Sequence, residues 1–158
     1  RTRGRCMKVD YGLFGRRVNA PAALARVKDR VIPPAECPKC RSTIDLVNHA
    51  EIYGKEYGWP LLYLCCGCGA RVGTHPGTDI PLGTLADERT IKARRETHEL
   101  LDGLWRSNPD RLRSRVYAAL NQLMGSQIHI GWLDFEGCQR VMTYCRTGQI
   151  SRLISQSA

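Results

Sequence analysis

The chain has 158 residues, of which 42% are hydrophobic and 25% charged, and its 24 basic and 15 acidic side chains give a formal net charge of +9. This composition is typical of a soluble globular protein, and no apolar run approaches the roughly 18 residues of a membrane helix, which argues against an integral membrane protein. The length suits one ordinary domain, or a small metal-stabilised module joined to a helical one.

Most of the charge lies near the N-terminus. Residues 1–32 hold nine basic side chains against Asp10 and Asp29, a surplus of +7, which leaves 9 − 7 = +2 for the rest of the chain. Residues 1–17, named the basic arm here, mix cations with glycines and have no sustained periodicity, so we expect an extended segment. Its cations are Arg1, Arg3, Arg5, Lys8, Arg16 and Arg17.

The basic arm is suited to a phosphate backbone, because each Lys or Arg that approaches a phosphate releases condensed counterions. Tyr11 and Phe14 lie among these charges, where they are suited to stacking on exposed bases. A solvated tail, or an arm that grips an acidic protein, are the alternatives. We predict that the arm contacts nucleic acid, either DNA or RNA.

A short helix is expected where the basic extension of residues 1–33 ends. Asn19 and Pro21 favour a helix start, and Leu24 and Val27 would lie on one side of it. The helix should end before Pro33, which is followed by a second proline.

Two Cys-x-x-Cys pairs follow, 24 residues apart, at Cys37 and Cys40 and at Cys65 and Cys68. Thiolates at this spacing surround one tetrahedral zinc ion when each pair forms a tight knuckle and the segment between them folds back as a hairpin. Two disulfides or a redox pair are the alternatives, but redox pairs occur singly. We predict one structural zinc ion. Four thiolates leave no open position for a catalytic water.

The segment around the cysteines is predicted to form a zinc ribbon over residues 34–83. Residues 43–48, 61–64 and 70–73 have the character of strands, and together they make a small antiparallel sheet. Residues 74–83 are rich in Pro and Gly and are expected to form an ordered loop or a linker.

A helical domain of about three helices is expected over residues 84–158, which makes the fold class α+β. The first helix would begin at a variant capping box, residues 84–87, and end near Trp105, with Ile91, His98 and Leu101 on its apolar face. The second lies between Pro109 and Gly125, and the third begins at Asp134. The polar tail after Gly148 is expected to be frayed.

Several segments resemble a family of zinc-finger-containing proteins from bacteriophages, prophages and bacteria, across roughly residues 35–145. The segments that carry the resemblance are Ile52-Tyr53-Gly54, Tyr57-Gly58, Leu64-Cys65, Cys68 through Gly73, His75 through Thr78, Pro81 through Asp87 and His129-Ile130-Gly131. The helix patterns of Arg94, His98, Trp105 and Cys138 also fit. The glycine expected after the first knuckle is Arg41 here. The resemblance implies zinc and a phage or bacterial setting, but it supplies no mechanism, since the family has no settled activity.

A catalytic site is the weaker hypothesis. His75 with Asp79, and with His98, offers a candidate general base or a second metal site. The alternative is structural: Asp79 and Thr84 serve loop and cap hydrogen bonds, and His98 is packed in the core. No nuclease signature fits the chain, so the protein is more readily a binding module than an enzyme.

Two further groups of residues are candidate binding sites, and each also has a purely structural explanation. His129, Cys138 and Cys145 offer three ligands for a second zinc ion, but thiols buried in a core explain the two cysteines as well. Gly83 and Thr84 would bind an anion at a helix start, or simply cap that helix.

We therefore predict a cytoplasmic zinc-ribbon module that contacts nucleic acid or a nucleoprotein complex through its basic arm, in a bacterial or phage-infected cell. Cytoplasm is expected because no signal peptide precedes the eight cysteines. The alternatives are an interaction protein that modulates a host transcription or defence complex without affinity for nucleic acid, and a hydrolase built on His75.

Overall fold

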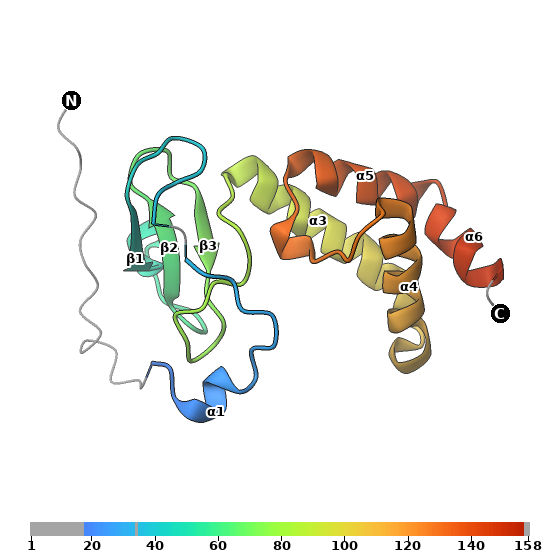
Figure 1. The fold of residues 1–158 in the computed structure, drawn as a ribbon, viewed down its shortest axis with the longest axis horizontal. Coiled ribbons are helices and arrows are strands. Elements are labelled where there is room, and N and C mark those ends of the chain that lie inside the picture. Colours follow the sequence, from blue (N-terminus) through green and yellow to red (C-terminus); the bar gives the residue numbers. More distant parts are fainter. Residues whose placement is uncertain (1–17, 34, 157–158) are drawn as a thin grey trace. The chain divides into compact units, whose positions relative to one another are not determined.

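The computed structural model describes residues 18–33 and 35–156, which form two compact units with their boundary between Asp87 and Glu88 (Figure 1). We call the described part up to Asp87 the zinc unit and the described part from Glu88 the helical unit. The α+β fold class predicted from the sequence is confirmed: a small antiparallel sheet comes first, and helices follow. No helix in this described part has the length and apolar character of a membrane span.

The sheet of the zinc unit consists of β1 (Ile44–Asn48), β2 (Leu61–Cys65) and β3 (Arg71–Gly73), antiparallel in the order β1-β2-β3 (Figure 1). Leu46 pairs with Tyr63, which pairs in turn with Val72. Four of the five residues of β2 are buried, because it is the central strand and pairs on both edges. All three strands lie within about a residue of their predicted positions.

The chain enters the zinc unit through the short helix α1 (Pro21–Leu24). A helix was predicted at this place, but the helix found is shorter than the spacing of the apolar residues suggests. Asn19 adopts a left-handed backbone conformation with φ 61°, which asparagine tolerates better than most residues. Its N–H donates to Gly77 O at 2.9 Å, and its side-chain oxygen accepts from Asp79 N at 3.2 Å. These bonds attach the chain, just after the basic arm, to the Pro/Gly loop.

The Pro/Gly loop of residues 74–83 is ordered by hydrogen bonds to its main chain. Trp59 Nε1 donates to Thr78 O at 2.8 Å, and the Tyr63 hydroxyl donates to Asp79 O at 2.9 Å. Thr74 and Thr78 are buried, and the Thr78 hydroxyl donates to His75 O. Of the two alternatives expected for this segment, an ordered loop or a linker, the structure has the ordered loop, packed as part of the zinc unit.

The helical unit contains α3 (Glu88–Trp105), α4 (Pro109–Met124), a 3-10 turn η2 (Ile130–Trp132), α5 (Phe135–Arg146) and α6 (Gln149–Gln156). Its main core cluster takes buried residues from all five elements: Leu101, Val116, Ala119, Leu120, Ile130, Val141 and Ile150. A smaller cluster between α3 and α5 consists of Ala93, Cys138 and Met142. Two of the helices start as expected, because the Asn108 side chain accepts from Arg111 N and the Asp134 side chain accepts from Gly137 N.

The start and the buried face of α3 differ from the prediction. Ala86 pairs with Arg71 beside β3, so the backbone is still extended there and the helix begins at Glu88. The buried face is formed by Thr90, Ala93, Thr97 and Leu101. His98 is exposed, because it lies one residue, or about 100°, beyond Thr97 around the helix. The prediction that His98 is packed in the core was wrong.

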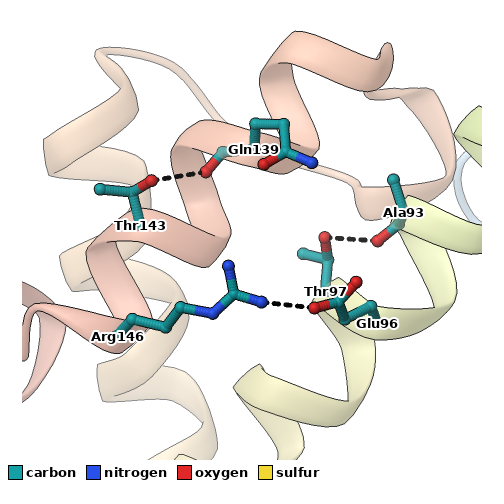
Figure 2. Close-up of polar contacts among 6 residues, drawn as sticks. All are labelled: Ala93, Glu96, Thr97, Gln139, Thr143 and Arg146. Atoms are coloured by element: carbon teal, nitrogen blue, oxygen red, sulfur yellow. Dashed lines mark hydrogen bonds and ion pairs between the residues drawn. The ribbon is translucent and has the colours of Figure 1, made fainter.

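A fourth helix replaces the expected frayed tail. In α6, Ile150 is fully buried, and Leu153 and Ile154 pack against the core cluster. Helix α5 lies along α3, where Arg146 and Glu96 form an ion pair (Figure 2). Figure 2 also shows the buried Thr97 hydroxyl donating to Ala93 O within α3, which satisfies the one polar group of that side chain.

Candidate metal centre

Four sulfur atoms converge at one end of the zinc unit. The Sγ atoms of Cys37, Cys40, Cys65 and Cys68 all lie within 4.8 Å of one another, and none of these cysteines is in a disulfide. The Cys37–Cys68 pair is 3.7 Å apart and the Cys40–Cys65 pair 3.3 Å. Zinc bound by thiolates at about 2.3 Å places tetrahedral sulfurs about 3.8 Å apart. The spacing therefore fits one tetrahedral zinc ion.

The two Cys-x-x-Cys pairs form knuckles with the same backbone hydrogen bonds. In the first, Cys37 N donates to Ser42 O at 2.9 Å, and Arg41 N donates to Cys37 O at 2.8 Å. In the second, Cys65 N donates to Ala70 O at 2.8 Å, and Gly69 N donates to Cys65 O at 3.0 Å. Each knuckle thus closes on itself and directs two sulfurs to the same side.

The residue after each second cysteine has a left-handed backbone. Gly69 has φ 74°, and Arg41 at the matching position has φ 62°. A glycine adopts this conformation freely, whereas a side chain with a Cβ is strained in it. This explains why a glycine is expected at position 41, and it shows that Arg41 tolerates the same turn at an energetic cost.

The second knuckle packs tightly against the first at Gly67. A Cβ on Gly67 would lie 2.1 Å from Ser42 Oγ and 3.2 Å from Cys40 Sγ. The N–H groups of Gly67 and Cys68 each point at Cys65 Sγ, at 3.4 Å. Amide groups that point at sulfur stabilise a thiolate, so this backbone both orients and supports the ligands.

The chemistry of the thiols also favours a cation. Hydrogen bonds from the Ser42 side chain and backbone lower the pKa of the Cys40 thiol to about 6. A hydrogen bond from the Ala70 amide lowers the pKa of the Cys68 thiol, but partial desolvation and the three neighbouring sulfurs together raise this pKa to about 12. Four thiols this close cannot all ionise alone, but a divalent cation compensates their charge and takes them all as thiolates.

The surroundings of the sulfurs are half apolar. Cys37 and Cys65 are buried and share a small cluster with Ala70, while Cys40 and Cys68 face solvent. Inside the first knuckle, Lys39 forms an ion pair of 2.8 Å with Asp87, the last residue of the zinc unit. The knuckle is thus attached to the end of the zinc unit as well as to β1.

A family model described as a zinc-finger-containing domain matches residues 33–148, which span both units. The chain belongs to this family. No curated protein and no solved structure matches the chain. The zinc-finger-containing domain and the thiolate cluster agree on one structural zinc ion, held by Cys37, Cys40, Cys65 and Cys68. With four protein ligands the ion is closed to water, so its role is to hold the two knuckles together.

The candidate catalytic residues do not form a recognisable site. His75 and Asp79 are half-buried in the Pro/Gly loop, where the hydrogen bonds are made by their main-chain groups. His98 is an exposed residue of α3, in the helical unit. Among the described residues, no hydrogen bond or ion pair joins the side chains of His75 and Asp79. Whether they act in a reaction stays a prediction.

The candidate second metal site is also not assembled. Cys138 is buried, and burial raises the pKa of its thiol. Burial likewise raises the pKa of Cys145, while the His129 ring lies against the Trp132 ring, with centroids 4.1 Å apart and planes inclined by 32°. Over residues 18–33 and 35–156, the four-cysteine cluster is the one group of three or more ligand side chains that converge. Packing in the core accounts for both cysteines, since Cys138 is buried and Cys145 packs, partly buried, against the core cluster.

The remaining predictions divide in two. Gly83 and Thr84 precede α3, which begins at Glu88, so they do not form its first turn. The predicted nucleic-acid contacts lie outside the described residues; they are Arg1, Arg3, Arg5, Lys8, Arg16 and Arg17.

Ser42 is the one residue of the metal centre that was not predicted from the sequence. Its signal was its place two residues after Cys40, at the position that Ala70 occupies in the second knuckle.

Proposed function

We propose that this protein is a binding module whose zinc unit supports a basic segment that contacts nucleic acid or a nucleoprotein complex. The zinc ion is structural, so the activity has to come from a surface. The most basic stretch of the chain is residues 1–32, with a surplus of +7. Because the thiolates must stay reduced to hold zinc, the proposed compartment is a reducing one, such as the cytoplasm of a bacterial or phage-infected cell.

The observation that carries the proposal is the attachment of this segment to the zinc unit. The two hydrogen bonds of Asn19 to Gly77 and Asp79 hold the chain just beyond the basic arm. Ala23 and Val27 are buried, while the three cations of this stretch are exposed. These are Arg26, Lys28 and Arg30. Cations on an anchored segment beside a rigid unit are suited to following a phosphate backbone.

The test is the salt dependence of binding to fluorescein-labelled duplex DNA and single-stranded oligonucleotides. Deletion of residues 1–17 removes six cations, which should reduce the slope of log K against log salt by up to about 5 for duplex DNA and about 4 for a single strand. A full-length variant with these six residues replaced by Gln is the matched control, since it removes charge but keeps length.

Both variants are expected to weaken binding and flatten the slope together. An unchanged slope in the Gln variant would contradict the proposal. If the unaltered protein binds no polyanion even at low salt, the interaction-protein alternative replaces it.

A further inference from the structure

Two exposed tyrosines lie side by side on the zinc unit, at the turn between β1 and β2. Tyr53 ends the short helix α2 (Ala50–Tyr53), and Tyr57 follows four residues later. The two residues are 42% and 54% exposed, and their ring centroids are 5.9 Å apart. Large aromatic residues that are exposed together mark a binding surface more often than single ones do. We call this pair the tyrosine platform.

A buried histidine holds the platform in place. His49 is 5% exposed, and its ring stacks under Tyr57 with centroids 4.2 Å apart and planes inclined by 24°. Its Nε2 accepts from Tyr57 N at 2.9 Å, and its carbonyl accepts from Tyr53 N at 2.9 Å. Its own N–H donates to Pro60 O at 2.7 Å. One side chain and its backbone therefore fix both tyrosines, so a ligand would order little that is not already ordered.

The groups beside the rings include cations. Arg71 Nε donates to the Tyr53 hydroxyl at 2.8 Å, and its guanidinium lies 5.4 Å from the centre of that ring. Lys55 is exposed between the two tyrosines in sequence, while the carboxylate of Glu56 accepts a hydrogen bond from Asn48. Flat rings with neighbouring cations match an unpaired nucleobase and its phosphate.

The platform is linked to the anchored end of the basic segment by one loop. Trp59, two residues after Tyr57, donates to Thr78 O. The next residue, Asp79, donates its N–H to Asn19. A nucleic-acid strand bound by the basic segment, residues 1–32, would therefore lie against the same zinc unit that carries the platform.

From these contacts we propose that the tyrosine platform stacks an unpaired base of single-stranded nucleic acid. The inference rests on the proposed function and adds the position and the chemistry of base contact. It predicts a preference for single strands that carry bases over a backbone of equal charge without them.

The experiment compares three labelled 15-mers, oligo-dT, oligo-U and an abasic strand, by fluorescence anisotropy at several salt concentrations. Tyr57→Leu should weaken binding of oligo-dT or oligo-U about 5- to 150-fold, the range that one stacked base carries. The salt slope and the binding of the abasic strand should not change. Tyr57→Phe should restore the affinity, because it keeps the ring. Trp132→Leu is the matched control, since Trp132 is 42% exposed and its ring also lies against a histidine ring.

The outcomes separate the two proposals. Suppose that the unaltered protein binds the strands with a salt slope that depends on the basic arm, and that Tyr57→Leu and Tyr53→Leu both bind as tightly as the unaltered protein. The platform is then refuted and the proposed function stands. This is the result expected if the rings contact a protein partner. If the unaltered protein binds none of the strands, both proposals are refuted.

Photocrosslinking of the unaltered protein to 5-iodouracil strands is a second measurement that does not depend on variant folding. Adducts should map to Tyr53 or Tyr57, and adducts confined to other residues would contradict the inference.

Discussion

Replacement of Gly67 by alanine should loosen the zinc centre through one steric contact. The new Cβ would lie 2.1 Å from Ser42 Oγ and 2.7 Å from Ser42 Cβ, whereas non-bonded heavy atoms attract at roughly 3.5 Å. Ser42 therefore has to move, and the hydrogen bonds that it gives to Cys40 move with it. Overpacking of this kind costs about 1–3 kcal/mol.

Because zinc binding and folding are coupled in a small metal-stabilised unit, that cost should appear as an apparent zinc affinity about 5- to 150-fold weaker. The assay is competition for zinc with a chelator of known affinity, followed by release of the metal and by circular dichroism. Gly103→Ala is the matched control, since a Cβ on Gly103 meets nothing within 4 Å and the residue lies inside α3. It should leave the zinc affinity unchanged.

The steric contact between residues 42 and 67 also predicts the behaviour of a double variant. Ser42→Gly removes both atoms that Gly67→Ala would strike, so the double variant should recover most of the affinity that Gly67→Ala loses relative to its own Ser42→Gly parent. An additive double-mutant cycle would refute the reasoning, because it would mean that the two side-chain positions do not compete for space.

Three further outcomes are expected. Chelation of zinc should abolish the sheet while most helical signal in far-UV circular dichroism survives, because the helical unit has its own apolar core; loss of both together would contradict this. Arg41→Gly should raise the free energy of unfolding of the zinc unit, measured by denaturant titration, by about 1 kcal/mol because it relieves the left-handed backbone, whereas Arg41→Ala should not. Ile150→Ala should destabilise the helical unit by about 2–5 kcal/mol in urea unfolding, because Ile150 is fully buried; the exposed Ser151→Ala is its control, and equal effects would show that α6 is not docked.

The sequence alone determined the metal centre and the order of the main elements. The Cys-x-x-Cys spacing is a local property of each knuckle, and it requires only that two knuckles meet. Helices α4 and α5 were predicted because Asn108, Pro109, Gly125 and Asp134 mark their ends through local backbone chemistry. Such signals act over a few residues, so they can be recognised before the fold is known.

Only the tertiary structure decided which local signals prevail. The start of α3 moved to Glu88 because Ala86 pairs with a strand that lies far from it in sequence. The tail became α6 because Ile150 finds a core made by four other elements, and the tyrosine platform exists because His49 brings two turn residues together. Burial and pairing depend on partners distant along the chain, and periodicity within one segment carries no information about those partners.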